Sequence, residues 1–293
     1  QNARVYLEYD HPTDIPVQEE GWTRFVCISD THSHTHWDDG GRMPRGDVLL
    51  HAGDLSSYGT VQRLKKTIDW LGGLEGYGTK VIIAGNHDLW LDKNCSELVQ
   101  FDKEERAAML DACQTLMAKS RLSQMGLTYL EFEETTIQAS NSTKEWKVFG
   151  SPASPLHSSG AFQYGTKKEA KEINSRIPSH TDILLTHTPP YQTLDKTRWD
   201  KHAGCKVLGK RLTSGRLRYC RLHVFGHIHE ATGAVIIDAV DGRAERVAVN
   251  YDSNSGTKIV SELIAIRFIR CHFIFSTSDF HECNMTSRHD FCE

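Results

Sequence analysis

The chain has 293 residues, of which 39% are hydrophobic and 25% charged, and its formal net charge at pH 7 is −4. This composition is typical of a globular protein with a real core, and the length allows one large or two small domains. The negative charge and the lack of a Lys/Arg-rich block argue against a long polyanion such as duplex DNA as the main partner. No charge-free apolar run reaches the length of a membrane span, so we expect no membrane partner.

Short apolar runs alternate with polar stretches that have helical spacing. The runs with the character of buried strands are Arg24–Ser29, Asp47–Ala52, Lys80–Gly85, Lys147–Ser151, Asp182–His187 and Leu222–His227. Helical spacing occurs at Val61–Leu71, Lys103–Lys119 and Lys167–Arg176. Residues 127–138 and 234–248 have the partly alternating pattern of further strands. This alternation predicts an α/β protein built in layers.

The eight cysteines form no CxxC pair and have no regular spacing. Cys27 lies in an apolar run, where a cysteine usually acts as a small hydrophobic residue. We therefore expect reduced cysteines and a cytoplasmic protein.

Polar residues gather where the predicted strands end. They are Asp30 and His32, then Asp54, then Asn86 and His87, then His187, and finally His227 and His229. In open α/β sheets, ligands bind at the carboxyl ends of the strands, so we expect these side chains to meet in one place. The stretch "DTHSHTH" alone is compatible with an acid-base set, a metal site or an accidental tract, but five such clusters favour a metal site.

In chain order these residues form the motifs D-x-H, G-D, G-N-H-D, a lone His and G-H-x-H. Together they closely resemble the calcineurin-like metallophosphoesterase superfamily. The stretches "THTPP" and "LHVFGHIHE" resemble its small metallophosphoesterase-domain family, which includes vertebrate brain proteins and fungal relatives and is similar to class III cyclic-nucleotide phosphodiesterases. The resemblance implies a layered β-sandwich flanked by helices over residues 24–250, with a dimetal site at the carboxyl ends of the strands. Residues 1–23 would then be an N-terminal extension and residues 251–293 a divergent C-terminal tail.

The resemblance also implies a ligand set and catalytic roles. Asp30, His32, Asp54 and His229 would hold the first metal, and Asp54, Asn86, His187 and His227 the second. Asp54 would bridge the two ions, since a carboxylate has two oxygens. His87 would contact the phosphate and act as the general acid, with Asn86 as a further substrate contact.

The ligand types suit divalent ions. A set of carboxylates, imidazoles and an amide favours Mn or Fe, with Zn or Mg as alternatives, and it lacks the thiolates of a structural zinc site. Two such ions clamp both sides of an in-line displacement and lower the pKa of a bridging water, so the expected nucleophile is a hydroxide between them.

Other histidines and their neighbours have alternative interpretations. His34 and His36 match no ligand position, and a solvated loop is favoured over substrate contact. His51 and His223 lie inside predicted strands and are expected to pack or to support the ligands. His202, Gly204 and Cys205 either line the substrate pocket or simply precede a helix. We take Gly204 and Cys205 as substrate-binding candidates. Asp88 either orients His87 or begins the next helix.

Three departures from the family pattern refine the function. Serine/threonine phosphatases of the superfamily carry an arginine after their G-D motif, whereas this chain has "GDLSSYG", which disfavours a phosphoprotein phosphatase. Some vertebrate relatives replace the first His of G-H-x-H by glycine, whereas His227 is present here. The tail lacks the proline-containing ending of the relatives.

The resemblance therefore implies a metal-dependent phosphodiesterase that hydrolyses small phosphodiesters, with cyclic nucleotides as the candidate substrates. A phosphomonoesterase or a nuclease for short ends is the enzymatic alternative. A scaffold module with the same fold is the alternative from another class, but a scaffold does not need the complete ligand set and His87.

Overall fold

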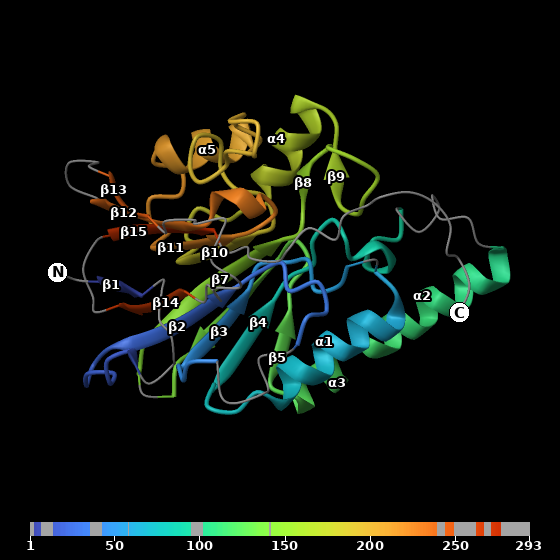
Figure 1. Ribbon diagram of the computed structural model, residues 1–293, viewed down its shortest axis with the longest axis horizontal. Helices are drawn as coiled ribbons and strands as arrows, with labels where there is room; N and C mark the ends of the chain where they lie inside the picture. The colour runs from blue at the N-terminus through green and yellow to red at the C-terminus, as the bar shows by residue number, and fades with distance from the viewer. Residues whose placement is uncertain are drawn as a thin grey trace.

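The computed structural model describes residues 3–6, 14–35, 43–57, 59–94, 102–140, 142–238, 244–248, 262–266 and 271–276. Two β-sheets lie face to face in the described part of the chain, and helices cover their outer faces (Figure 1). Helices α1, α2 and α3 lie beside the first sheet, and α4 and α5 lie beside the second. The predicted layered α/β sandwich is thereby confirmed.

The first sheet has six strands in the order β1-β14-β2-β3-β4-β5. Their bounds are β1 Ala3–Tyr6, β14 Glu262–Ile266, β2 Thr23–Ile28, β3 Val48–His51, β4 Thr79–Ile82 and β5 Leu127–Tyr129. Strands β2 to β5 are parallel, so their carboxyl ends lie at one edge.

The second sheet has seven strands in the order β13-β12-β15-β11-β10-β7-β6. Their bounds are β13 Ala244–Ala248, β12 Gly233–Asp238, β15 Cys271–Ser276, β11 Leu222–Phe225, β10 Ile183–Thr186, β7 Glu145–Ser151 and β6 Glu133–Gln138. Strands β7, β10 and β11 are parallel and lie side by side. A small parallel pair, β8 (Ser154–Pro155) and β9 (Gln163–Tyr164), stands apart from both sheets.

Alternating side chains of the strands explain the layers. In β2, Phe25 and Cys27 belong to the core between the sheets, whereas Val26 and Ile28 pack with the helices on the outer face. Because neighbouring residues of a strand point to opposite faces, a strand buried on both faces must be apolar throughout. This is why the sequence shows continuous apolar runs instead of clean alternation.

The helices are α1 Val61–Gly73, α2 Lys103–Leu116, α3 Lys119–Gln124, α4 Lys167–Ser175 and α5 Lys206–Thr213. Two short 3-10 helices, η3 Leu89–Leu91 and η5 His229–Ala231, follow ligand-bearing loops. The helix predicted to reach Lys119 ends earlier, at Leu116, and α3 begins at Lys119 after a break. Periodicity alone did not reveal this break, because the apolar spacing continues across it.

The predicted division into an extension, a domain and a tail stays a prediction. Strands β1, β14 and β15 nevertheless come from the segments outside residues 24–250 and join the two sheets. Cys27, Cys113, Cys205 and Cys220 are buried and form no disulfide with one another, and a cytoplasmic location stays a prediction. None of the helices in the described ranges has the length and apolar character that crossing a membrane requires.

Candidate metal centre and active site

The predicted ligands follow strands whose carboxyl ends meet between the two sheets. Asp30 and His32 follow β2, Asp54 follows β3, Asn86 and His87 follow β4, His187 follows β10, and His227 and His229 follow β11. The structure brings all eight residues together. Two groups have ligand atoms within 4.8 Å of one another and could hold a metal ion: Asp30, His32 and His229, and Asp30, Asp54 and His187.

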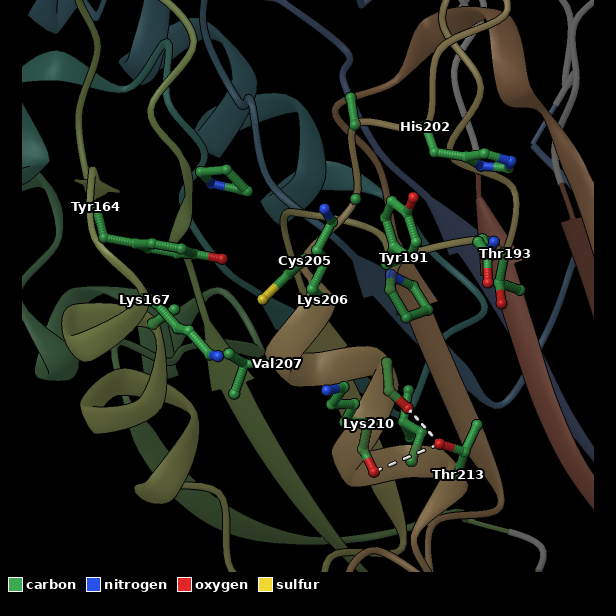
Figure 2. A pocket seen from close by; sticks show the side chains of 18 of the residues that line it. Tyr164, Lys167, Tyr191, Thr193, His202, Cys205, Lys206, Val207, Lys210 and Thr213 are labelled. Atoms are coloured by element: carbon green, nitrogen blue, oxygen red, sulfur yellow. Dashed lines mark hydrogen bonds between the residues drawn. The ribbon is translucent and has the colours of Figure 1, made fainter.

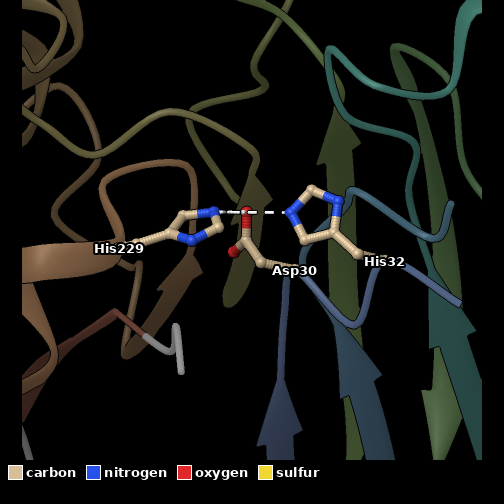
Figure 3. A group of neighbouring side chains, drawn as sticks. All are labelled: Asp30, His32 and His229. Atoms are coloured by element: carbon tan, nitrogen blue, oxygen red, sulfur yellow. Dashed lines mark hydrogen bonds and ion pairs between the residues drawn. The ribbon is translucent and has the colours of Figure 1, made fainter. Parts of the chain in front are cut away.

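The first group is built around Asp30, which lies between two imidazoles (Figure 3). Its Oδ1 is 3.5 Å from Nε2 of His229, and Nε2 of His229 is 3.4 Å from Nε2 of His32. The carboxylate also accepts hydrogen bonds from the backbone N–H of His227 and the hydroxyl of Ser29. These contacts fix the carboxylate, and although burial opposes ionisation, the contacts with His229 lower the pKa of Asp30.

Asp54 contacts predicted ligands of both ions. Its Oδ1 accepts a hydrogen bond from the backbone N–H of His87 at 2.8 Å. Its Oδ2 is 3.4 Å from Nε2 of His187 and 3.8 Å from Nε2 of His32. One carboxylate oxygen thus faces a predicted ligand of each ion, which is the geometry that a bridging carboxylate needs.

Two histidines predicted to bind the second ion converge on the amide of Asn86. Its Oδ1 lies 2.9 Å from Nε2 of His187 and 2.7 Å from Nδ1 of His227. His187 donates its Nδ1–H to the carbonyl oxygen of Ala52 at 3.0 Å, so the lone pair of Nε2 points at the amide oxygen. Metal-bound histidines commonly use the second ring nitrogen in this way.

The donor set fits divalent cations. Nε2 of His187, Oδ1 of Asn86 and Oδ2 of Asp54 all present lone pairs to one another, so a proton or a cation must lie among them. Burial by itself lowers the pKa of His187, but the negative charge of Asp54 raises it to about 9. This small volume therefore attracts positive charge strongly.

Several ligand residues have unusual backbone angles. The φ angles are 52° for Asp30, 47° for His32, 53° for Asp54 and 75° for His227. A positive φ is uncommon in residues other than glycine and is found at functional sites that the surrounding fold supports. The backbone turns sharply after each strand, and this turn directs the side chains to the centre.

Glycine precedes the ligands in three motifs because another strand end packs against it. A Cβ on Gly53 would lie 2.6 Å from Nδ1 of His187, and a Cβ on Gly85 would lie 2.7 Å from its Cε1. A Cβ on Gly226 would overlap the carboxylate of Asp30. The glycines therefore allow three backbone turns to approach the ligands closely.

His87 lies at the exposed side of the group. Its Nδ1–H donates to the carbonyl oxygen of Ser57 at 2.8 Å, which leaves Nε2 for an external partner. Its ring stands edge-on to the ring of His32, with centroids 4.9 Å apart. The position fits the predicted contact with substrate.

The other predicted residues fall into distinct places. His34 is exposed, and His36 lies outside the described residues. His51 contacts Thr31 at 2.9 Å, so it braces the loop that carries the first ligands. His223 contacts Thr186, beside His187, at 2.7 Å. Both histidines are buried in the positions expected of supporting residues.

Asp88 has a role that the sequence did not indicate. Among the described residues, its side chain forms no hydrogen bond with His87, and it does not cap η3. Instead, its buried carboxylate accepts from the backbone N–H groups of Leu55, Ser56 and Gly85. Burial and the nearby charge of Asp54 raise its pKa to about 6. Asp88 thus ties the G-D loop to the G-N-H-D loop, and no local pattern could have revealed a contact between residues so far apart.

Gly204 and Cys205 lie at the start of α5, where the Cys205 side chain accepts from the backbone N–H of Leu208. They line a cavity whose described lining includes none of the eight residues above. Their predicted contact with substrate stays a prediction. Asp195 was missed by the sequence analysis: it is buried and holds this loop through the N–H groups of Gln192 and Gly204 and through His202.

Carboxylates, imidazoles and an amide that meet at strand ends between two packed sheets define a metal-dependent hydrolase. The sequence profile of the calcineurin-like phosphoesterases matches residues 23–231, and the chain belongs to this family. It is therefore a phosphoester hydrolase of the metallophosphoesterase superfamily, whose members use a dimetal site.

The chain is similar to several known proteins. The chain is 36% identical over 244 residues to metallophosphoesterase domain-containing protein 1 of Homo sapiens, covering 80% of this chain and 69% of that protein. It is 37% identical over 214 residues to a protein of Emericella nidulans named probable rhamnogalacturonate lyase C, covering 73% of this chain but only 18% of that protein. Among solved structures, a metallophosphoesterase from Sphaerobacter thermophilus is 15% identical, covers 87% of this chain and 75% of its own, and has a TM-score of 0.31.

Proposed function

We propose that the protein is a phosphodiesterase that hydrolyses small phosphodiesters, with cyclic nucleotides as the leading substrate class. The position of His87 is the observation that carries this proposal. Its backbone N–H is bound to Asp54 and its Nδ1–H to Ser57, so Nε2 is held beside the candidate ligands and faces outward. A proton on Nε2 is placed to reach the leaving oxygen, and a nucleoside alkoxide leaves readily only when it is protonated.

The charge around the site supports a diester over a monoester. Among the described residues, no Lys or Arg side chain forms an ion pair or a hydrogen bond with any of the eight candidate residues. A monoester carries nearly two negative charges at neutral pH, so an additional cation such as arginine beside the metal ligands would favour its binding. A diester carries one charge and does not need them.

Asp30, His32, Asp54 and His229 would hold one divalent ion, and Asp54, Asn86, His187 and His227 the other. The mixed oxygen and imidazole donors favour Mn or Fe, with Zn or Mg as alternatives. When bound, two such ions supply Lewis acidity toward the phosphoryl oxygens and make a water molecule a stronger nucleophile at neutral pH. The protein itself contributes the fixed ligand geometry and the proton on His87.

A turnover panel with Mn tests the proposal. The substrates are bis-p-nitrophenyl phosphate, p-nitrophenyl phosphate, and 2′,3′- and 3′,5′-cyclic nucleotides, with Asp54→Ala as the control for contaminating phosphatases. We expect the diesters to have a higher kcat/KM than p-nitrophenyl phosphate. Preference for the monoester would indicate a phosphomonoesterase, and no turnover by folded, metal-loaded protein would indicate a scaffold.

A further inference from the structure

A large cavity lies beside α4 and α5 (Figure 2). Its volume is about 1380 Å³, and segments 164–167, 190–193 and 202–207 form much of its wall. The described lining shares no residue with the eight candidate active-site residues, although it includes Gly204 and Cys205, the predicted substrate contacts.

The lining is cationic. Lys167, Lys206, Lys210 and Arg218 contribute to it, and the described lining contains no Asp or Glu. Between Lys206 and Arg221 the chain has six Lys or Arg residues and no acidic residue, a basic stretch that the sequence analysis overlooked. In a chain whose net charge is −4, this separation of charge creates a local potential that attracts anions.

No described carboxylate neutralises these cations, although Arg218 donates to the hydroxyl of Tyr219 at 3.3 Å and lies over its ring. None of the four has an ion-pair partner among the described residues, and Lys206 instead lies over the ring of Tyr191, with Nζ 4.9 Å from the centroid. Several lysines around one cavity suit an anion with more than one negative charge, such as a phosphate, better than a single carboxylate.

The inside of the cavity offers a hydroxyl that the fold uses only weakly. Tyr164 is 7% exposed, and among the described residues its hydroxyl contacts the thiol of Cys205 but has no oxygen or nitrogen partner. Figure 2 shows this hydroxyl directed into the cavity toward the sulfur of Cys205, with the ammonium group of Lys167 directed to the same space. The sulfur is occupied by the backbone N–H of Leu208 at 3.3 Å. A hydroxyl whose partner is a thiol can still form an ordinary hydrogen bond with an oxygen or nitrogen atom of a ligand.

His223 adds a further polar group to the lining. Thr186 donates its only hydroxyl hydrogen to the carbonyl oxygen of Thr188 at 2.7 Å, so it must accept from Nε2–H of His223, also at 2.7 Å. Nδ1 of His223 is then a bare acceptor, and it has no hydrogen-bond partner among the described residues. The wall thus presents a hydroxyl and an imidazole acceptor in addition to the cations.

We propose that this cavity is a second ligand site, which binds a small organic phosphate whose body can form hydrogen bonds. Lys167 and its basic neighbours hold the phosphate, and Tyr164 contacts the body of the ligand. A nucleoside monophosphate has this chemistry, and AMP is a suitable test compound.

Isothermal titration of AMP into Asp54→Ala protein measures this site without the metal centre, once circular dichroism has shown that the variant is folded. We expect AMP to bind, and both adenosine and inorganic phosphate to bind at least about 10-fold more weakly. Equal affinity for AMP and adenosine, or no binding of AMP, would overturn the proposal. If Asp54→Ala does not fold, AMP is titrated into the Mn-loaded wild-type protein and into Mn-loaded Lys167→Glu protein. The number of AMP sites per chain should then be lower in Lys167→Glu.

Matched variants locate the site. Lys167→Glu should weaken AMP binding at least about 10-fold, whereas Lys168→Glu, on the same helix but outside the lining, should not. Tyr164→Phe should weaken it about 2- to 12-fold, the range of one neutral hydrogen bond, while the free protein unfolds at the same or a higher temperature. If Tyr164 had only a structural role, Tyr164→Phe would lower the unfolding temperature and leave the affinity for AMP unchanged. If both variants bind AMP like their parent, the cavity is not the site.

Discussion

Replacing Gly53 by alanine should damage the metal centre from a position that is not itself a ligand. Gly53 has a φ of +101°, which lies outside the region that residues with a Cβ normally use. The new Cβ would also lie 2.6 Å from the carbonyl oxygen of Ala84 and 2.6 Å from Nδ1 of His187. Contacts of this kind are normally about 3.4 Å, so the neighbours must move by roughly 0.8 Å.

The size of the effect follows from these contacts. Backbone strain should cost about 1–2 kcal/mol and the overlap about 1–3 kcal/mol, so we expect a loss of roughly 2–5 kcal/mol in the free energy of unfolding. A displaced His187 weakens its bond to Ala52 and turns Nε2 away from Asn86. Because a shift of 1 Å can cost about 100-fold in rate, kcat/KM should fall about 10- to 100-fold.

Two control glycines separate the causes. Gly21 has a φ of +78° and no atom within 4 Å of its missing Cβ, so Gly21→Ala should lose about 1 kcal/mol of stability and no activity. Gly73, at the end of α1, has neither a positive φ nor a neighbour within 4 Å, so Gly73→Ala should be neutral or slightly stabilising. Urea unfolding, turnover of bis-p-nitrophenyl phosphate and metal content are measured for all three variants. Wild-type turnover and metal content in Gly53→Ala would refute the close packing of Gly53 against His187.

Three further predictions concern single side chains. His87→Ala should keep its metal and lose about 10²- to 10⁴-fold in turnover of a cyclic nucleotide, but less with a nitrophenolate leaving group; equal losses on both substrates would count against the acid role. His32→Ala should lose metal and activity, whereas His34→Ala, at an exposed position, should keep its metal and its activity. Loss of metal from His34→Ala but not from His32→Ala would show that the ligand register is wrong. Lys80 donates to three backbone carbonyl oxygens at the end of α1, so Lys80→Met should cost about 3 kcal/mol in urea unfolding. Lys65→Met, which breaks an exposed pair, should cost less than about 1 kcal/mol, and similar losses for the two lysines would contradict this account of Lys80.

The strands and the meeting of the ligands could be predicted because their signals are local. Continuous apolar runs mark strands buried on both faces, and the polar residues at their ends are read directly from the sequence. Because the strands that carry the ligands are parallel within each sheet, their carboxyl ends lie at the same edge of that sheet. Gly53, Gly85 and Gly226 were visible as parts of motifs, but their contacts with neighbouring strand ends appear only in three dimensions.

The supporting contacts could not be predicted, because they join residues distant in sequence. Asp88 binds the loop after β3, and His51 braces the loop after β2. The cavity beside α5 depends on how that helix packs near α4 and the loop held by Asp195. Hydrophobic periodicity describes one element at a time and carries no information about such contacts.

We propose that Asp54 would be shared by two metal ions that this chain needs for hydrolysis. The most direct measurement is metal content by mass spectrometry together with turnover of bis-p-nitrophenyl phosphate, for wild-type and Asp54→Ala protein after chelation and reconstitution with Mn. We expect wild-type protein to lose activity on chelation and regain it with two ions per chain, and Asp54→Ala to lose metal and turnover together. An Asp54→Ala protein that retains two ions and substantial diesterase activity would contradict the account.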